Sequence, residues 1–426
     1  MSKIEELIQQ YCPDGVECYK LQELGDFYSG LSGKSKDDFR DGNAKFISYV
    51  NIYNNPSLKT DVEERVKIAE GERQNTIQYG DMLFTGSSET PNECGMCSVL
   101  THHTGEKLYL NSFCFGFRFH DLSDKCPSFM KHLFRSYSIR KKICKTANGV
   151  TRYNISKKEF AKIEIPLPPL PVQEEIVRIL DTFTELQAEL QAELQARLLQ
   201  YQFYRDKLFA FDDRTDIKYK KLGEVFDTTT DFTAAGSFAD IAKNVVYKRE
   251  IDYALLVRTT DIKSNFSKED KVYISQSAFE YLWRVNLNKA SIILPNIGAN
   301  CGEVHFITPE TLPQEHCALG PNALLLRTST CHNRFYYHYF NTNTFQKELR
   351  KIISPGGQTK FNKTELRKIE IPIPSLEEQE RIATALDRFD TLVNDLSKGL
   401  PVEIEARKQQ YEYYRDKLLT FKKKEA

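Results

Sequence analysis

The sequence predicts a mixed α/β (α+β) protein in which two globular domains are separated by two long antiparallel helices that form a coiled-coil spacer. Three observations support this architecture: the 426 residues exceed one ordinary domain, the chain contains an internal repeat, and two long segments have the pattern of amphipathic helices. The repeat predicts pseudo-two-fold symmetry. We place a first globular domain with a short N-terminal helix at 1–165, the central helical spacer at 166–215, a second globular domain at 216–371 and the distal helical spacer at 372–426.

The repeat is clearest at two Pro-punctuated segments. Residues 162–168 read KIEIPLP, and residues 368–374 read KIEIPIP about 206 residues later. The YRDKL of 204–208 recurs at 414–418 with an offset of about 210 residues, so the second copy has gained about four residues between these landmarks. Such a long period is not that of a solenoid. It indicates a duplicated module of variable block, hinge and helix.

The first long helix is expected from Pro171 to about Phe211, because the stretch after Pro171 contains no Gly or Pro and places apolar residues three or four positions apart. At 1.5 Å per residue it would span roughly 60 Å, and an apolar stripe of that length needs a partner helix. The second repeat supplies one at 376–421, with a break expected at Gly399-Leu400-Pro401. The apolar positions of the first helix also include Ile179 and Leu198. The stripe residues assigned to the spacer are Ile176, Leu180, Phe183, Leu186, Leu190 and Leu194 in the first helix and Ile382, Leu386 and Phe389 in the second.

A tetrapeptide, Glu-Leu-Gln-Ala, occurs three times in tandem at 185–196. Each unit adds about 6 Å of helix. The tandem is either a strong helix former duplicated by replication slippage or a ruler whose unit number sets the distance between the two blocks.

The two variable blocks are predicted to combine short strands and short helices. We expect strands at 46–50, 113–119, 255–259 and 323–327, turns at 86–88 and 295–300, and helices at 129–143 and 334–352.

Composition excludes several classes of protein. With 59 basic and 59 acidic residues the formal net charge is zero, which excludes a globally basic nucleic-acid binder but not a local basic face.

No run of about 18 apolar residues predicts a membrane span, and no apolar signal segment opens the chain, so we expect a cytoplasmic protein with reduced thiols. Cys94 and Cys97, followed by His102 and His103, lack further ligands at a regular zinc-site spacing, so ordinary thiols are the preferred interpretation.

The chain contains no recognisable catalytic constellation. Residues 29–35 (SGLSGKS) resemble the end of a phosphate-binding loop, but Tyr28 occupies the position where that loop requires Gly. Residues 64–67 (ERVK) place a Glu and a Lys close together, as in half of a nuclease site, but such a group arises easily by chance in a chain with 28% charged residues. We therefore predict a protein that is not an enzyme.

Two basic runs suggest binding to nucleic acid. Seven basic and no acidic residues occur from Lys131 to Arg152, with tyrosines interleaved. From Arg334 to Lys368, eight basic residues occur against two acidic ones. Each run leads to a Gly-x-Thr-basic-aromatic-Asn element, at 149–154 and at 357–362. Lys and Arg neutralise phosphates, while polar and aromatic side chains reach base edges. The alternative is a solvated helix face, with the two elements bracing the hinge.

These features together resemble the DNA-specificity subunit of type I restriction–modification systems. The resemblance rests on the two hinges at 163–173 and 369–379, the duplication, the opening CPDGV at 12–16 and the Glu-Leu-Gln-Ala tandem, and it covers essentially the whole chain.

The resemblance implies that each variable block is a target-recognition domain for one half of a bipartite double-stranded DNA target, and that residues 2–16 pack near the C-terminal helix. The helices would set the gap and dock two modification (methyltransferase) subunits, and restriction (translocase and nuclease) subunits would join that core. This chain would bind no cofactor or metal, since S-adenosylmethionine, ATP and Mg would bind to partner subunits. Because the two blocks differ in sequence, we expect an asymmetric target.

The resemblance and the basic runs together give the candidate residues. For DNA binding they are Lys141, Lys142, Lys145, Gly149, Thr151, Arg152, Tyr153 and Asn154, with Arg350, Lys351, Gly357, Thr359, Lys360, Phe361 and Asn362. For the spacer and partner docking they are the nine apolar stripe residues given above.

Two other functions remain open at this point. A coiled-coil scaffold that joins proteins without touching DNA would lack salt-dependent DNA binding. A stand-alone nuclease would need a metal-binding carboxylate cluster, which the sequence does not show.

Overall fold

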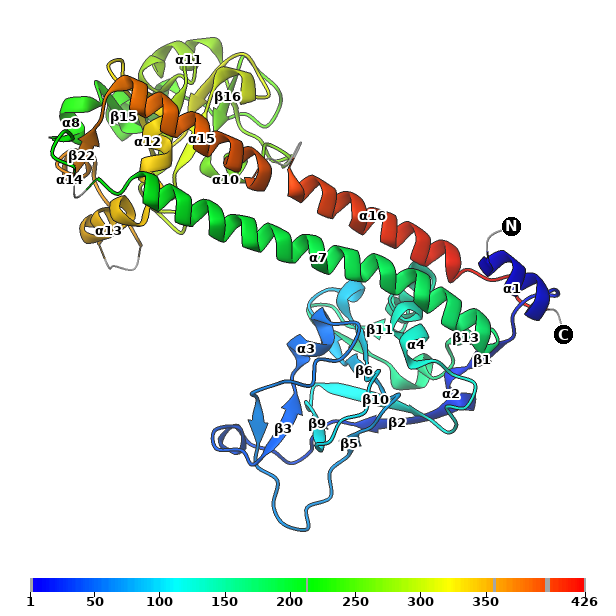
Figure 1. The fold of residues 1–426 in the computed structure, drawn as a ribbon. Coiled ribbons are helices and arrows are strands. Elements are labelled where there is room, and N and C mark those ends of the chain that lie inside the picture. Colours follow the sequence, from blue (N-terminus) through cyan, green and yellow to red (C-terminus); the bar gives the residue numbers. More distant parts are fainter. Residues whose placement is uncertain (1–2, 212–213, 355–357, 395–398, 425–426) are drawn as a thin grey trace. The chain divides into compact units, whose positions relative to one another are not determined.

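The computed structural model describes residues 3–211, 214–354, 358–394 and 399–424. The chain divides into two units, which Figure 1 shows as a ribbon. Unit 1 comprises Met1–Gln191 and Glu403–Ala426, and unit 2 comprises Ala192–Val402. Each unit has a hydrophobic core of its own that includes residues of the long helices. Among the described helices none is long and apolar enough to cross a membrane.

Unit 1 is built from short strands in four sheets with helices around them. Its helices are α1 (Lys3–Tyr11), α2 (Leu21–Leu24), α3 (Tyr49–Asn54), α4 (Pro127–Leu133), α5 (Tyr137–Cys144), α6 (Lys157–Phe160), part of α7 (Leu170–Leu208) and most of α16 (Leu400–Leu418). Its strands are β1 (Cys18–Lys20), β2 (Gly25–Ser29), β3 (Ala44–Ile47), β4 (Arg65–Val66), β5 (Thr76–Ile77), β6 (Met82–Thr85), β7 (Ser87–Ser88), β8 (Cys97–Val99), β9 (Leu108–Leu110), β10 (Cys114–Phe119), β11 (Ala147–Asn148), β12 (Tyr153–Ile155) and β13 (Glu164–Pro166).

Unit 2 repeats this plan with fewer strands. Its helices are the remainder of α7 with α8 (Leu222–Val225), α9 (Phe238–Asn244), α10 (Thr259–Lys263), α11 (Gln276–Tyr281), α12 (Asn333–Phe340), α13 (Asn343–Ile352), α14 (Lys363–Leu366) and α15 (Leu376–Asn394). Its strands are β14 (Lys218–Lys221), β15 (Thr228–Asp231), β16 (Ala254–Val257), β17 (Tyr273–Ile274), β18 (Ser291–Pro295), β19 (His305–Ile307), β20 (Cys317–Leu319), β21 (Ala323–Arg327) and β22 (Glu370–Ile373).

The sheets confirm the internal repeat. The antiparallel order β2-β10-β6-β8 in unit 1 corresponds to β15-β21-β18-β19 in unit 2. The parallel pair β3 and β9 corresponds to β16 and β20, and the antiparallel pair β1 and β13 corresponds to β14 and β22. Strands β10 and β21 are almost fully buried because each is a central strand of its sheet with helices packed against it. The mixed α/β fold with long helices is therefore as predicted.

The two long helical segments also follow the sequence pattern. α7 is continuous over 39 residues. The second segment is broken as expected, since α15 ends at Asn394 and α16 begins at Leu400, with 395–398 outside the described residues. Pro401 lies in the first turn of α16, where its missing N–H removes no helical hydrogen bond.

Several smaller predictions were wrong. The helix expected at 129–143 is two helices, α4 and α5, and that at 334–352 is also two, α12 and α13. At each junction a hydroxyl, of Ser136 or Thr342, donates a hydrogen bond to the carbonyl three residues earlier, and the chain then starts a new helix. Residues 87–88 form the short strand β7 and not only a turn, and Val50 lies in α3 and not in a strand.

The N-terminal and C-terminal segments of unit 1 pair with each other through their backbones. The backbone N–H of Val16 donates to the carbonyl of Lys422 at 2.8 Å, and Val16 forms a parallel bridge with Lys423. Glu17 pairs with Lys424 at 2.9 Å. Residues 12–16 therefore pack beside the end of α16, as the resemblance implied.

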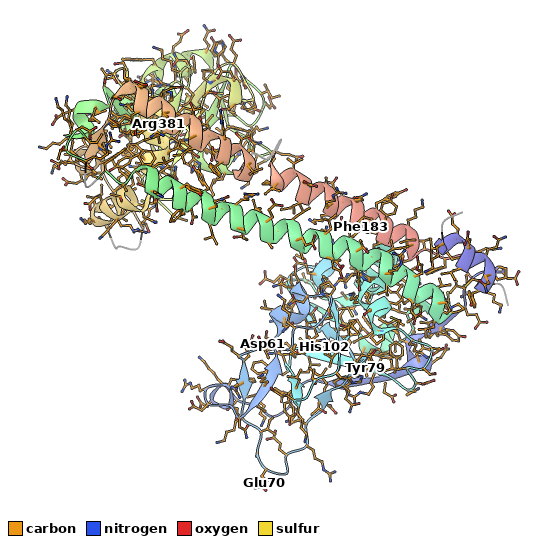
Figure 2. The ribbon with its side chains drawn as sticks, in the orientation of Figure 1. Asp61, Glu70, Tyr79, His102, Phe183 and Arg381 are labelled. Atoms are coloured by element: carbon orange, nitrogen blue, oxygen red, sulfur yellow. The ribbon has the colours of Figure 1, made fainter. Side chains whose placement is uncertain are left out.

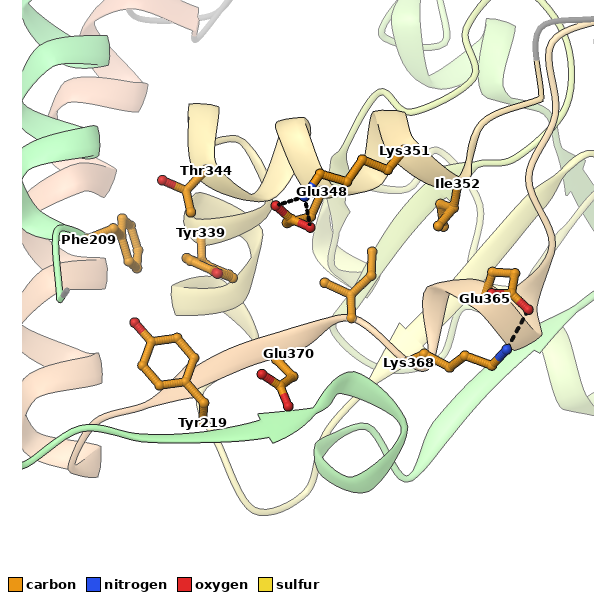
Figure 3. A pocket seen from close by; sticks show the side chains of 11 residues that line it. Phe209, Tyr219, Tyr339, Thr344, Glu348, Lys351, Ile352, Glu365, Lys368 and Glu370 are labelled. Atoms are coloured by element: carbon orange, nitrogen blue, oxygen red, sulfur yellow. Dashed lines mark hydrogen bonds and ion pairs between the residues drawn. The ribbon is translucent and has the colours of Figure 1, made fainter.

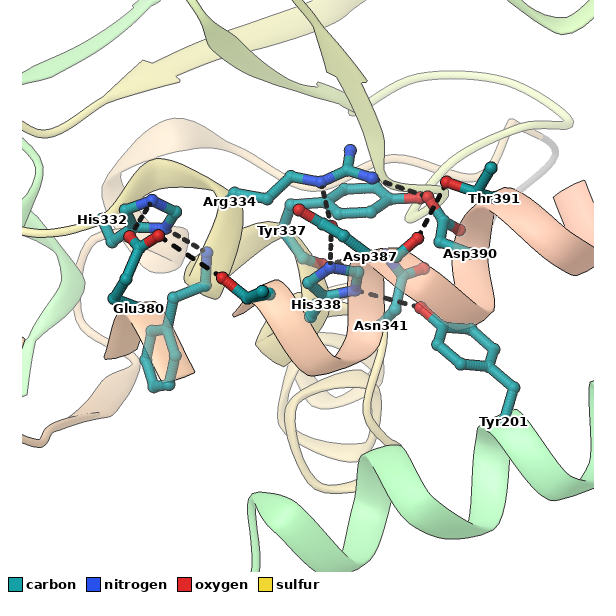
Figure 4. A network of polar contacts seen from close by, with 12 residues as sticks. Tyr201, His332, Arg334, Tyr337, His338, Asn341, Glu380, Asp387, Asp390 and Thr391 are labelled. Atoms are coloured by element: carbon teal, nitrogen blue, oxygen red, sulfur yellow. Dashed lines mark hydrogen bonds and ion pairs between the residues drawn. The ribbon is translucent and has the colours of Figure 1, made fainter. Parts of the chain in front are cut away.

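A buried histidine joins the helices in each unit. In unit 2, His338 of α12 places Nε2 at 2.6 Å from the Asp387 carboxylate of α15 and Nδ1 at 3.0 Å from the Tyr201 hydroxyl of α7 (Figure 4). A neutral ring with its proton on Nε2 satisfies both contacts, because it donates to the carboxylate and accepts the hydroxyl proton. Asp387 also binds the guanidinium of Arg334 (Figure 4).

Unit 1 contains the same arrangement. His132 of α4 lies 2.6 Å from Asp181 of α7 and 2.9 Å from the hydroxyl of Tyr411 in α16. His132 and Asp181 precede His338 and Asp387 by about 206 residues, and Tyr411 follows Tyr201 by about 210, which are the two offsets of the repeat. We call the two sets the His–Asp–Tyr networks.

A glutamine fixes each hinge in the same way. The Gln173 side chain accepts the N–H of Cys126 at 2.9 Å and donates to the Pro168 carbonyl at 2.7 Å. Its repeat counterpart, Gln379, accepts the N–H of His332 at 2.8 Å and donates to the Pro374 carbonyl at 2.9 Å. The repeated hinge sequence thus recurs as repeated contacts.

The networks predict that the protein loses stability as the pH falls. Burial lowers the pKa of His132 and of His338 below the ordinary histidine value. The unfolded chain therefore binds protons that the folded chain does not, so stability is present above about pH 6.5 and is lost as the pH falls below it. The double variant His132→Gln/His338→Gln should show a smaller pH dependence of the free energy of unfolding, measured by urea denaturation between about pH 7.5 and 5.5.

The control for this prediction is His103→Gln, because His103 is exposed and belongs to neither network. This variant should keep the wild-type pH dependence. An unchanged pH dependence in the double variant would contradict the assignment.

Candidate nucleic-acid interface

A β-hairpin carries the candidate residues of unit 1. β11 and β12 pair antiparallel, with Asn148 opposite Asn154, and residues 149–152 form the connection. Gly149 has φ +149°, and a Cβ there would lie 2.0 Å from the carbonyl oxygen of Arg152, so the tip requires glycine. The tip residues from Gly149 to Arg152 are exposed, as is Asn154, while Tyr153 is half-buried.

Arg152 carries an uncompensated charge at this tip. Its guanidinium donates to the hydroxyl of Ser87 at 3.0 and 3.2 Å and lies 5.9 Å from the ring of Phe113, which is itself 62% exposed. These partners are neutral, so the positive charge remains available to a phosphate.

The basic run of unit 1 divides into structural and surface residues. Arg135 and Arg140 are largely interior and donate to backbone carbonyls, among them that of Cys97 at 2.8 Å and that of Gly95 at 2.5 Å. Burial lowers the pKa of both guanidinium groups. These two arginines hold the fold together, so the sequence run overstates the basic surface.

Lysines of the same run remain on the surface. Lys141 and Lys145 are exposed and line a cavity of about 560 Å³ beside α5, and the Lys141 ammonium lies 5.9 Å from the ring of Tyr137. Lys142 is exposed as well but donates to the carbonyl of Glu164 at 2.7 Å. Lys141, Lys145 and Arg152 are therefore the cations of this run that are exposed and have no backbone carbonyl or carboxylate partner among the described contacts.

The corresponding segment of unit 2 is arranged differently. Thr359 and Lys360 are exposed, and Lys360 bridges the backbones of Ser354 and Ile297. Phe361 is only 4% exposed and packs in the core, and the Asn362 side chain accepts the N–H of Glu365 at 2.8 Å as the cap of α14. Gly357 lies outside the described residues. Two of the predicted residues therefore brace the fold, and Thr359 and Lys360 face solvent.

The basic run of unit 2 is partly neutralised by its own acids. Figure 3 shows Lys351 bound to Glu348 and Lys368 bound to Glu365 around a cavity of about 490 Å³. Arg350 is exposed. Lys351 and Lys368 are thus paired with carboxylates, and exposed ion pairs of this kind contribute little to stability.

The predicted apolar stripe lies mostly inside the two units. Ile176, Leu180, Ile382 and Leu386 are fully buried in the cores. Phe183, labelled in Figure 2, stacks on Tyr414 with ring centroids 5.4 Å apart. Leu190 is buried, Leu186 and Leu194 are half-buried, and Phe389 packs on Tyr204 at 6.0 Å.

The long helices also carry exposed apolar residues that were not predicted from the sequence. Leu199 and Phe203 of α7 are 67% and 62% exposed, and Tyr413 of α16 is 61% exposed. Phe203 and Tyr413 are equivalent positions of the repeat, one residue before each YRDKL. Both residues lie off the buried apolar stripe of their helix. Assigning every helix position to the buried or the exposed face would have identified them from the sequence.

The residues that the sequence offered for metal or phosphate binding have other partners in the structure. The Cys94 thiol donates to the carbonyl of Tyr153 at 3.1 Å, and burial raises the pKa of Cys97 to about 12. Lys34 lies in the segment 29–35 that resembles the end of a phosphate-binding loop, and it forms an ion pair with Glu72 at 2.6 Å. No group of three or more His, Cys, Asp or Glu side chains that could hold a metal occurs among the described residues.

Comparison with known proteins gives a consistent result. The family model described as the type I restriction modification DNA specificity domain matches residues 13–200 and again residues 214–406. A type I restriction enzyme specificity subunit of Escherichia coli is 33% identical over 281 residues, which are 64% of this chain and 66% of that protein. A putative type I restriction enzyme specificity subunit of Haemophilus influenzae is 33% identical over 289 residues, 64% of this chain and 68% of its own length.

The fold is also that of a solved structure. A chain from work on complex assembly and conformational transition of the type I restriction–modification system aligns over 96% of this chain and 98% of its own length. The TM-score is 0.60 at 17% identity, a likeness that concerns the fold.

Proposed function

Because the chain belongs to the type I restriction–modification DNA specificity family, whose domain it contains twice, we propose that each unit carries a target-recognition domain for one half of a bipartite, asymmetric DNA target. Residues 1–165 and 216–371 are the two recognition domains, and residues 166–215 and 372–426 are the helical spacers. The observation that carries the proposal is the doubled fold, with the same sheet order in both units and different surface residues on each.

A split target has a physical advantage. A half-site of a few base pairs discriminates weakly, since each mismatched pair costs roughly 1–3 kcal/mol. Two half-sites read by one chain add their discrimination, and a connected second contact forms at a high effective concentration. Different surfaces on the two units favour different half-sites and hence an asymmetric sequence.

The chain is the non-catalytic, DNA-specificity component of such a system. We propose that S-adenosylmethionine, ATP and Mg are bound by modification and restriction subunits, and that the chain acts in the cytoplasm with its host DNA. The gap between half-sites is set by the helices, and the Glu-Leu-Gln-Ala tandem at 185–196 contributes to its length.

Two modification subunits would dock on the exposed apolar residues of the long helices. Leu199, Phe203 and Tyr413 support this assignment, because large apolar side chains at such exposure are typical of surfaces that a partner covers. The equivalence of Phe203 and Tyr413 in the repeat supports two copies of the same partner.

The hairpin of unit 1 gives a direct test of DNA binding. Arg152→Ala should weaken binding of the full chain to a mixed-sequence duplex and reduce the slope of log affinity against log salt by about 1, because one phosphate contact is lost. Fluorescence anisotropy of a labelled duplex at several salt concentrations measures both. Lys145→Ala should act in the same direction.

The matched control is Arg40→Ala, which removes an exposed cation already paired with Asp37 at 3.1 Å. Its affinity and salt slope should equal those of the wild type. Salt-independent association of the wild type, or none, would support the scaffold alternative.

Partner docking predicts a different variant. Phe203→Ala should weaken binding of the co-expressed modification subunit by about tenfold or more, as expected for an aromatic anchor at an interface, while DNA affinity of the isolated chain stays unchanged. Phe238→Ala is the control, because Phe238 is an exposed phenylalanine, 81% accessible, on α9. Equal partner affinity for the two variants, measured by surface plasmon resonance, would exclude this docking surface.

A further inference from the structure

Unit 2 contains a cavity of about 450 Å³ that the candidate residues do not line. It lies among β15, the 3-10 turn Trp283–Val285, β21 and the start of α14, and its lining includes Trp283, Arg284, Lys289, Arg327 and Lys363. The volume is in the range of pockets that hold a small ligand or part of a polymer.

Trp283 is the only tryptophan of the chain, and it is 62% exposed. Tryptophan is the side chain with the most apolar area to gain from burial, so such exposure is typical of a binding surface. The guanidinium of Arg284 lies 4.4 Å from the centre of the indole ring, and one of its N–H groups donates to the Ala234 carbonyl at 3.4 Å. The ring is therefore held in place by a cation on one face.

The cations of this cavity exceed its acids. Arg284 and Lys289 are exposed, and Arg327 donates only to neutral oxygens, including the Ser291 hydroxyl at 2.8 Å. Lys363 pairs with Asp231 at 3.2 Å. The carboxylate in the lining, Asp227, accepts the N–H of Ser329 at 3.0 Å.

Strand β15 forms one wall of the cavity. Thr229 and Thr230 line the cavity, and Thr230 is 8% exposed. Within the part of the chain that the structure describes, neither buried hydroxyl has a hydrogen-bond partner.

We propose that this cavity is a DNA-contacting site of unit 2 that takes one nucleotide of the target, with the base or sugar packed against the indole and the phosphate held by Arg284 and Lys289. The inference rests on the proposed function and adds a specific site to it. An aromatic face is tolerant of any base, while cations supply the phosphate contact, and the cavity offers both side by side.

The site would also distinguish the two units. Unit 1 contains no tryptophan, so it has no counterpart of this stacking surface. The two units would then contact their half-sites through different chemistry: a cationic hairpin tip in unit 1, and an aromatic, cationic cavity in unit 2.

The single tryptophan makes the site directly observable. Addition of a mixed-sequence duplex to the full chain at low salt should lower tryptophan emission, and the titration midpoint should match that from anisotropy of the labelled duplex. Unchanged emission during a titration in which anisotropy shows the complex would overturn the site and leave the proposed function standing. The absence of any complex by anisotropy would overturn both.

Variants test the aromatic contact and the phosphate contact separately. Trp283→Ala should weaken DNA binding by about tenfold, the loss expected when one base or sugar loses its aromatic platform. Lys289→Ala should weaken it and reduce the salt slope by about 1. Phe238→Ala and Lys218→Ala are matched controls on exposed residues outside the cavity and should bind as the wild type does.

Inorganic polyphosphate tests whether the ligand is a nucleotide. Polyphosphate has the charge of DNA but no base or sugar, so it should leave tryptophan emission nearly unchanged at concentrations that compete with duplex. Quenching by polyphosphate equal to that by DNA would overturn the nucleotide assignment, as would Trp283→Ala binding equal to that of Phe238→Ala.

Discussion

A buried imidazole held between a carboxylate and a tyrosine hydroxyl is the interaction on which each unit depends. His132 and His338 each connect a short helix of the globular part to two long helices, at distances of 2.6 to 3.0 Å. A buried polar group is tolerated only when its hydrogen bonds are complete, so this contact specifies one arrangement of three segments where apolar packing alone would allow several.

The same contact explains why distant parts of the sequence form one unit. Tyr411 belongs to the last helix, yet its hydroxyl binds a histidine of the first half, and Leu419 is buried in the core of unit 1. The bridge between Val16 and Lys423 closes this unit at the ends of the chain. A repeated frame thus supports two surfaces that differ in residue type, which is what a protein that reads two different half-sites requires.

The repeat, the long helices, their break and the strand at 323–327 could be predicted from the sequence, because periodicity and Pro or Gly positions are local signals. Exposure was harder to predict, since it depends on tertiary packing. Arg140 counted as surface charge in the sequence but binds carbonyls in the interior, and Phe361 lies in the core. The Trp283 cavity could not be foreseen, because its lining comes from segments far apart in the chain.

The most direct measurement is the methylation pattern of host DNA after co-expression of this chain with its modification subunit. The account predicts a split motif with two different half-sites, methylated in each half. Removal of residues 193–196 should change the gap and leave both half-sites unchanged, because that segment lies within α7 and belongs to neither proposed recognition domain. A continuous or palindromic motif, or a gap unaffected by the deletion, would contradict the account.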